Sequence, residues 1–317
     1  MDQFIELSDP CPKMDSVSQI FIESVSSMLC SLDCLETKHS LSGRWRKSIE
    51  FYQERLVYST VHLFGEFGEG WKYDFVDRRK KRYFYLDQAM QDSKILRVDM
   101  IRLHRDSRNR ENLRSISAKD VVEKLLPFVF RHLCGWCNWM EIRYFDDAHV
   151  MKRLPAVFRA NPLLAMLAID VVREEMEDLL REVLATGGLK KLELRGYSSD
   201  SSVRLLAEAI RLGNIKELRF PIESFPVTTE LCRAVFDRWI ATGGAETVKV
   251  RSAEKFDFEE LERDLEEMGI RKDILEKTKK KTRILFTKPG IKGGIQYCYE
   301  NDVKSLVRHK CCFEYVC

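Results

Sequence analysis

The sequence predicts an α/β protein in which a short helical module precedes a row of alternating strands and helices. Three observations predict this class. An apolar template at positions i, i+3 and i+5 recurs at similar intervals from residue 139 onward. The segments between its copies carry apolar residues at helical spacing. Residues 14–55 are different in kind, because their apolar residues fall on helical faces.

The N-terminal module, residues 14–55, is expected to contain three short helices. Asp33 followed by Glu36 has the spacing of a capping box, which would open the second helix. Leu41 and the following Gly43 lead into the third. A module below about 70 residues rarely has a sufficient core of its own, so a partner or a docked neighbour is expected. One face of the first helix is apolar, with Val17, Ile20, Phe21, Val25, Met28 and Leu29.

Residues 56–117 contain strand-like pieces joined by charged turns. Ile95, Val98 and Met100 fit the apolar template, so this region is expected to form a linker sheet or a degenerate first repeat. The basic run DRRKKR at 77–82 has two interpretations. It is either a nuclear-localisation signal or phosphate-contacting segment, or an ordinary solvated turn.

Residues 118–270 hold five copies of the template, at steps of 25, 25, 26 and 30 residues. The spacing predicts five adjacent parallel strands, one in each copy. An ordinary series of strand–helix–strand units would produce a similar interval, so the repeat is one of two interpretations. The five triplets are Trp139, Ile142 and Tyr144; Leu164, Leu167 and Ile169; Leu189, Leu192 and Leu194; Ile215, Leu218 and Phe220; and Ala245, Val248 and Val250.

The segments between the triplets are predicted to be helices on one outer face. Each predicted helix ends near a glycine, as a C-terminal cap requires. The inward positions are Val203, Leu206, Ala207 and Ile210 in one helix and Leu231, Ala234, Val235 and Trp239 in the next.

The L-x-x-L-x-L template, with a strand and a helix in each unit, resembles leucine-rich repeats. The Asn or Cys expected at i+8 is absent, so the resemblance is to degenerate repeats. The turns must therefore satisfy their backbone groups in another way. The resemblance implies a solenoid whose units are stable only when stacked. Residues 271–317 are then expected to form a closing cap. The five i+8 positions hold Asp147, Val172, Tyr197, Glu223 and Ala253.

A second resemblance concerns the N-terminal module. An I-x-x-V-x-x-M-L helix, a D-x-L step at Asp33 to Leu35 and the basic-Trp-basic triplet at 44–46 resemble an F-box, in the divergent form of nematode F-box-like proteins. The fold class is therefore predicted as α/β, with a short trihelical F-box-like module followed by an irregular leucine-rich-repeat-like solenoid. A helical cap on the solenoid is the alternative for residues 14–55.

The F-box resemblance implies a Skp-type adaptor and a cullin-RING ubiquitin ligase core as partners. The repeat region would then be the substrate receptor, and the chain would have no catalytic activity of its own. A repeat scaffold without a ligase link is the runner-up. The residues expected to contact the adaptor are Val17, Ile20, Phe21, Val25, Leu29, Leu35 and Trp45.

The target is expected on the sheet face that points away from the helices. Side chains alternate along a strand, so positions i+2, i+4 and i+6 point outward when i+3 and i+5 are buried. Basic residues predominate there, which predicts an acidic protein target; ordinary solvation of a sheet face is the alternative. The candidate target-binding residues are Arg143, Lys191, Glu193, Arg195, Arg219, Lys249 and Arg251.

Catalytic, metal and cofactor sites are not expected. Cys134 and Cys137 form C-G-W-C, but a redox motif needs a strand before it and a helix after it, and here the predicted order is reversed. A thiol-based enzyme using this pair remains the third reading. His132 with the two cysteines lacks a second ligand pair for zinc.

Composition limits the kinds of partner and the cellular compartments that are expected. A net charge of +3 is too small to indicate nucleic acid as a partner. The sequence shows no apolar run of membrane-spanning length and no signal peptide. The ten cysteines show no framework spacing, which favours a reducing compartment, the cytoplasm or the nucleus.

Overall fold

The structure is a computed structural model of the 317-residue chain, and its fold is α/β. It describes residues 18–28, 43–66, 70–93, 95–105, 112–133, 138–143, 148–160, 164–170, 174–196, 199–221, 227–246, 248–252, 256, 259–278, 281–301 and 309–316.

In the part of the chain that the structure describes, α1 and α3 precede the first strand, and strands and short helices follow. These elements are α1 (Gln19–Met28), α3 (Gly43–Arg55), β1 (Val57–Glu66), β2 (Gly70–Asp77), β3 (Tyr83–Phe84), α4 (Leu86–Gln91), β4 (Leu96–His104), β5 (Arg114–Ile116), α5 (Ala118–Asp120), the π-helical turn η2 (Val121–Leu125) and α6 (Leu126–Arg131).

The second half alternates regularly between strand and helix and then ends in a run of strands. These elements are β6 (Trp139–Arg143), α7 (Ala148–Ala160), β7 (Met166–Ile169), α8 (Glu174–Ala185), β8 (Lys191–Leu194), α9 (Asp200–Leu212), β9 (Glu217–Phe220), α10 (Thr229–Ala241), β10 (Lys249–Ser252), α11 (Glu259–Glu267), β11 (Arg271–Lys277), β12 (Lys281–Thr287), β13 (Gly294–Asn301) and β14 (His309–Val316).

Within the described residues, 14 strands are hydrogen-bonded into one mixed sheet, in the order β11-β12-β13-β14-β10-β9-β8-β7-β6-β4-β1-β2-β3, with β5 paired to β2. The neighbours from β1 and β4 through β10 run parallel. Antiparallel strands flank them, β2, β3 and β5 at one end and β11–β14 at the other.

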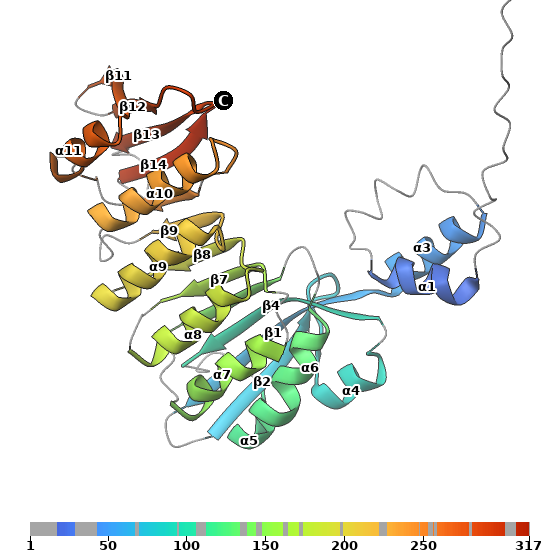
Figure 1. Ribbon diagram of the computed structural model, residues 1–317. Helices are drawn as coiled ribbons and strands as arrows, with labels where there is room; N and C mark the ends of the chain where they lie inside the picture. Colours follow the sequence, from blue (N-terminus) through green and yellow to red (C-terminus); the bar gives the residue numbers. More distant parts are fainter. Residues whose placement is uncertain are drawn as a thin grey trace, which may run out of the picture.

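The predicted adjacency of the five repeat strands is confirmed, because β6 to β10 are consecutive parallel neighbours. Every crossover therefore advances in the same direction along the sheet. Parallel crossovers are almost always right-handed, so a series that never reverses places its helices on one face. Figure 1 shows α7, α8, α9 and α10 side by side on that face.

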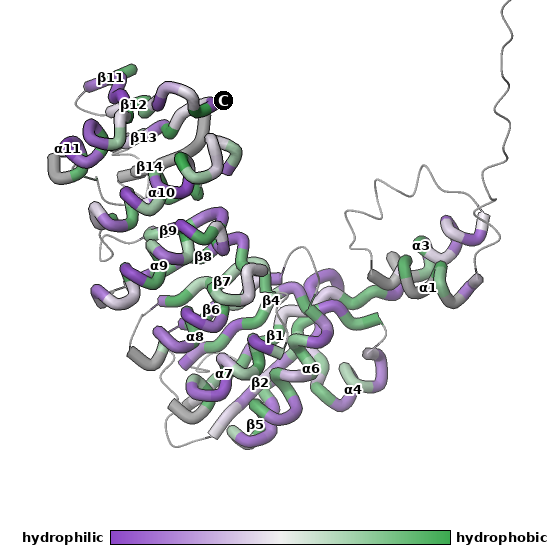
Figure 2. The backbone as a smooth tube through the Cα atoms, in the orientation of Figure 1, coloured by the Kyte–Doolittle hydropathy of each residue, from purple (hydrophilic) through white to green (hydrophobic). Residues whose placement is uncertain are grey.

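The core lies between these helices and the strands beneath them. Leu192, Leu194 and Leu218 have no exposed surface, and they belong to one continuous cluster with the inner faces of the helices. All of the predicted inward positions on α9 and α10 are buried. Figure 2 shows hydrophobic and hydrophilic residues alternating along the helices, in keeping with one buried and one exposed side.

The predicted register is wrong by two residues at both ends of the repeat region. On β6, Ile142 pairs with Ile169 rather than with Leu167. On β10, Val250 pairs with Leu218, so the buried Ser252 occupies the place that Val250 was expected to fill. A shift of two leaves every side chain on its predicted face, because the period of a strand is two.

The first residues of β8 and β9 show how backbone groups in the turns form hydrogen bonds without a row of asparagines. The backbone N–H groups of Lys190 and Lys191 both donate to Ala165 O, at 2.8 and 3.0 Å. One repeat further on, Lys216 and Glu217 donate in the same way to Lys190 O, at 3.1 and 2.9 Å. Strands β8 and β9 thus each begin on a carbonyl that accepts two hydrogen bonds, which meets the backbone requirement locally.

Residues 56–117 contribute strands to this same sheet, since β4 pairs directly with β6 and β1 pairs with β4. The helix pair α1 and α3 is different. Figure 1 shows it standing away from the sheet, joined where α3 leads into β1.

Candidate functional site

The face of strands β4 and β6–β10 opposite helices α7–α10, here named the open face, carries charged side chains from every strand but β7. The backbone hydrogen bonds between the strands fix their register, and the register determines which side chains are neighbours on adjacent strands. Lys191, Glu217 and Lys249 form one row; Arg102, Glu141, Ala168, Glu193, Arg219 and Arg251 form the next; and Arg143, Asp170 and Arg195 lie beyond them at the strand ends.

Glu141 is the centre of the first charge cluster on the open face. Only 1% of its side chain is exposed, and Arg143 holds Oε1 through both Nε (2.7 Å) and Nη2 (2.5 Å). Arg102 Nε lies 3.0 Å from Oε2, an ion pair in which the N–H does not point at the oxygen. A buried carboxylate needs such partners, because an unpaired charge in a sheet interior is strongly destabilising.

Arg195 connects Glu141 to two further carboxylates. Its Nε donates to Glu193 Oε1 at 2.7 Å, and its Nη1 lies 3.2 Å from Asp170 Oδ1 and 3.3 Å from Glu141 Oε1. Every nitrogen of its guanidinium is therefore engaged, Nη2 by Glu193 as well. The set Arg102, Glu141, Arg143, Asp170, Glu193 and Arg195 is named the locked cluster.

The pKa values in the locked cluster reflect the balance of burial and pairing. Burial alone would raise the pKa of Glu141, but the surrounding arginines outweigh it and hold that pKa below its ordinary value. Burial raises the pKa of Asp170 above its ordinary value, although Arg195 and Arg143 oppose the shift. The cluster is thus a structural network in which the arginines compensate buried acids.

The second charge cluster, on β8–β10, has a different balance. Arg219 and Arg251 are directly opposite each other in the parallel pair β9–β10. Both approach the same oxygen, Glu217 Oε1, through Nε, at 2.5 and 3.3 Å. Among the described residues, no hydrogen bond reaches the Nη atoms of either arginine. Two guanidinium ends therefore stand next to one another on the open face.

Lys191 lies in the same part of the open face. Burial lowers the pKa of Lys191, and Arg219 and Arg251 add to the shift, against the opposing effect of nearby glutamates. Lys191, Arg219, Lys249 and Arg251 are basic, and Glu217 is the acid that lies between them on these strands, because Glu193 is engaged by Arg195. The β8–β10 part of the open face is therefore electropositive, whereas the locked cluster is compensated.

All of the predicted target-binding residues lie on the open face, so the structure brings them together. Arg143 and Arg195 contact the acids of the locked cluster, whereas the Nη atoms of Arg219 and Arg251 have no hydrogen bond among the described residues. Whether the set binds a target stays a prediction. The sequence interpretation missed Glu141, Asp170 and Arg102, although their alternation along the strands could have indicated the face.

Only some of the residues predicted to contact the adaptor have described side chains in the N-terminal helices. Val17, Leu29 and Leu35 lie outside the described residues, and Ile20 is on α1 without a described side chain. Phe21 is 54% exposed, and its ring packs edge-on against Trp45 at 6.2 Å between centroids. Trp45 is buried and Val25 is half-buried.

The helix pair has a small and imperfect core. Ile22 and Ile49 are fully buried between the helices, but so are the hydroxyls of Ser26 and Ser48, and neither has a hydrogen-bond partner in the described part of the chain. A buried unpaired hydroxyl costs about 1–3 kcal/mol. On the outer side of α3, Phe51 is exposed, with the Arg55 guanidinium over its ring at 4.1 Å. Two exposed aromatic rings thus lie on a weakly stabilised pair.

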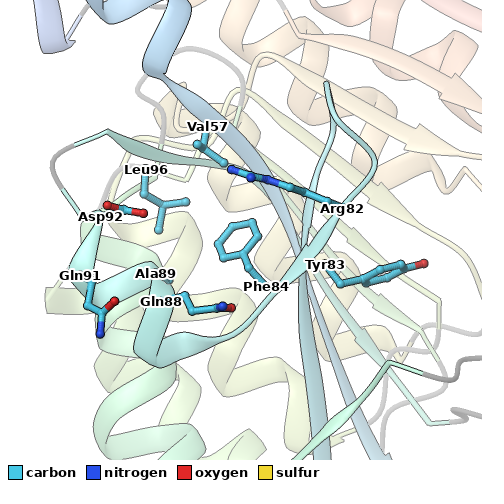
Figure 3. Close-up of a pocket in the computed structure, with 9 residues that line it drawn as sticks. All are labelled: Val57, Arg82, Tyr83, Phe84, Gln88, Ala89, Gln91, Asp92 and Leu96. Atoms are coloured by element: carbon cyan, nitrogen blue, oxygen red, sulfur yellow. The ribbon is translucent and has the colours of Figure 1, made fainter.

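A cavity of about 280 Å³ lies where β1 and β4 begin, beside α4. Figure 3 shows Phe84 pointing into it, with Val57 and Leu96 alongside, Arg82 extending over it and Asp92 across from Arg82. The lining combines apolar side chains with Arg82, Asp92 and two glutamines, Gln88 and Gln91.

The basic turn that links β2 to β3 is held in one conformation. Arg78 Nη1 bonds Asp99 Oδ2 at 2.5 Å, and the Arg79 guanidinium lies 4.8 Å from the Tyr58 ring centre. Asp77 caps the turn by accepting from the backbone of residues 79 and 80. These contacts favour the interpretation of the run as an ordinary structured turn.

Two further interpretations concern the cysteine pair and metal binding. Cys134 and Cys137 lie outside them, so the thiol interpretation is not tested. The described part of the chain has no cluster of three or more His, Cys, Asp or Glu placed to bind a metal ion. Among the same residues, no helix has both the length and the apolar character needed to span a membrane.

Comparisons with known proteins found no match: no protein-family model, no curated protein and no solved structure is significantly similar to this chain. The resemblances to F-box and leucine-rich-repeat proteins therefore depend on the residues that carry them.

Proposed function

We propose that this chain is the substrate-recognition adaptor of an F-box-type cullin-RING ubiquitin ligase. Residues 14–55 are its F-box-like module and bind a Skp-type adaptor. The irregular leucine-rich-repeat-like solenoid that follows binds a protein target, and the antiparallel strands of residues 271–317 close its end. The chain acts by binding, without catalysis or cofactor, in the cytoplasm or the nucleus.

The position of α1 and α3 carries the proposal. A helical cap on the repeats would lie against the sheet, whereas this pair stands away from it (Figure 1). Its exposed Phe21 and Phe51, together with the unpaired hydroxyls in its core, favour a pair that is completed by another protein. Exposed aromatic residues are typical anchors of protein interfaces.

The open face supports the second half of the proposal. The described crossover helices α7–α10 lie on the other side of these strands, and solenoids use the extended side opposite their helices for binding. The surplus of positive charge around Arg219 and Arg251 matches an acidic target.

The test is a titration of the purified full-length chain with a purified Skp-type adaptor. Phe21→Ser should weaken the complex by at least about tenfold, because truncation of a central aromatic anchor commonly costs about 2 kcal/mol. Leu212→Ser is the matched control, since Leu212 is 60% exposed on α9 and Phe21 is 54% exposed on α1. The control should bind the adaptor as tightly as the unmodified chain.

Thermal melts of both variants separate binding from folding. Absence of any complex with the unmodified chain would remove the ligase link and leave the runner-up, a binding scaffold that uses the open face alone. Equal loss of adaptor binding in the Phe21 and Leu212 variants would also contradict the assigned surface. Co-purification from cells with degradation blocked then identifies the target.

A further inference from the structure

We propose that Cys298 and Cys312 form a redox modification site, a pair of thiols that a peroxide converts into a disulfide bond between β13 and β14. The two cysteines are directly opposite each other in this antiparallel pair of strands. The inference does not depend on the proposed function, because it concerns the C-terminal strands of the chain alone.

The spacing of the two strands suits a disulfide bond. Residues directly opposite each other in an antiparallel pair have Cα atoms about 4.5–5.5 Å apart. A disulfide joins Cα atoms that are about 4.4–6.8 Å apart, so neither strand has to be displaced. The Cβ atoms of opposed residues are about 4.5–5.5 Å apart, slightly more than the roughly 3.5–4.5 Å that a disulfide needs. The bond is therefore expected under mild strain, and strained disulfides are the ones that are most easily reduced again.

The pair is on the side of the sheet that faces away from the core. Tyr297 is 1% exposed and belongs to the core, so its neighbour Cys298 is on the opposite face of β13. Cys298 is a half-buried free thiol, and the side-chain amide of Gln296 lies 2.7 Å from its sulfur. Cys312 is also opposite Arg251 of β10, which places the pair beside the open face. A small dissolved oxidant can reach Cys298 there.

The register distinguishes Cys312 from its neighbour Cys311. Cys311 is opposite Tyr299 on β13 and Ser252 on β10, so neither adjacent strand places a cysteine across from it. Cys232, the other cysteine with a described side chain, is buried on α10. The bond of Cys298 is therefore expected with Cys312 and not with Cys311.

The reaction needs one hydroperoxide, for which hydrogen peroxide is the simplest case. One thiolate attacks a peroxide oxygen, the O–O bond breaks and hydroxide leaves, so that this sulfur becomes a sulfenic acid. The second thiolate attacks the same sulfur, the S–O bond breaks and a second hydroxide leaves. The two hydroxides take up the two protons that the thiols released. Two thiols are thus oxidised by two electrons to one disulfide, and one peroxide is reduced to two waters.

The bond would stabilise the end of the sheet. β14 is the strand through which β11, β12 and β13 connect to β10. A bond from β13 to β14 closes the loop between residues 298 and 312, which removes conformations from the unfolded chain. In a reducing compartment such a disulfide is transient and forms when an oxidant is present.

The experiment treats the purified, fully reduced full-length chain with equimolar hydrogen peroxide, alkylates the remaining thiols and maps the disulfides by mass spectrometry. The main disulfide of Cys298 should be with Cys312. Cys311→Ser is the matched control on the same strand and should keep this bond, whereas Cys298→Ser and Cys312→Ser should each lose it. Peroxide should raise the Tm of the Cys311→Ser variant by about 2–5 °C, because loop closure stabilises the folded chain, and it should not raise the Tm of the other two.

Three results would overturn the inference: a Cys311→Ser variant without the bond, Cys298 joined mainly to a different cysteine, or an equal rise in Tm for Cys298→Ser. Melting curves of the reduced proteins show whether each variant is folded. If a serine variant does not fold, fragmentation of the cross-linked peptide from the unmodified chain decides between Cys311 and Cys312. Because neither adaptor nor target is present in the assay, its outcome leaves the proposed function untouched.

Discussion

Replacement of Glu141 by Gln tests whether the locked cluster stabilises the sheet. Glu141 is the only carboxylate that Arg102 and Arg143 contact among the described residues, and Arg195 would keep two others. The change therefore leaves two guanidinium groups beside a neutral amide on a side chain with 1% exposure. Glu193→Gln is the control, since Glu193 contacts Arg195 alone.

The magnitude follows from these contacts. Removing one partner of a buried ion pair costs about 3–5 kcal/mol when the remaining charge is fully buried. Arg102 and Arg143 are 32% and 42% exposed, so solvent screens part of that cost and the expected loss is about 3 kcal/mol. The control should lose about 1 kcal/mol. At roughly 2.1 cal/mol/K per residue, 3 kcal/mol lowers Tm by about 5 °C for 317 residues unfolding together.

The assay is thermal unfolding at pH 7 followed by circular dichroism, with urea unfolding of the same variants as a second measure. A Glu141→Gln variant that melts within about 1 °C of the unmodified chain would refute the reasoning, and so would a control that loses more. Either result would mean that the arginines are compensated by solvent rather than by Glu141.

Three further outcomes are expected. Leu192→Asp should abolish cooperative unfolding of the repeat region, because a carboxylate at a position without exposure costs several kcal/mol; a variant with a normal melt would contradict the predicted core. Gly244→Ala should cost about 1 kcal/mol more in urea unfolding than Gly243→Ala, because both have positive φ (85° and 60°) but only at Gly244 would the new Cβ meet a backbone atom, the carbonyl oxygen of Lys292; equal losses would exclude that contact. The pKa of Glu141 is lowered in the folded chain, so its contribution is present above its ordinary value of 4.5 and is lost as pH falls through the lower folded value. The stability difference between the unmodified chain and Glu141→Gln should shrink over that acid range, and a constant difference would count against the pairing.

The central strands could be predicted from the sequence because their buried residues are all apolar and alternate with polar ones. Leu192, Leu194 and Leu218 point into the core, and an apolar template finds such residues directly. The same template misplaced the register at both ends. Trp139 fits the template but lies on the open face, and Ser252 is polar but buried on the inner face. A pattern of apolar residues cannot detect a buried serine, so the register there had to come from the backbone ladder.

The candidate site was predicted as a face but not as a set of contacts. Alternation with period two indicates which side chains share a side of the strand, and all of the predicted residues do. Whether an acid compensates a given arginine depends on the residue opposite it on the neighbouring strand. An error of two residues in the predicted register assigns the wrong opposite residue. Arg143 thus forms its ion pair with Glu141, while Arg251 and Arg219 both pair with Glu217. The sequence alone gave these two arginines the same role.

The open face follows from the topology, and its division into two parts follows from the placement of acids. Crossovers in one direction place the described helices α7–α10 on one side of β4 and β6–β10, and long polar side chains cover the backbone on the other side. Where an acid is buried, as at Glu141, the arginines around it must stay in place for the sheet to be stable. Where two arginines share one acid that is 23% exposed, as at Glu217, they keep donors that cost little to expose. Comparison of Arg143→Gln with Arg251→Gln therefore separates stability from target binding. Arg143→Gln should lower Tm and leave target capture unchanged, and Arg251→Gln should lower target capture and leave Tm unchanged.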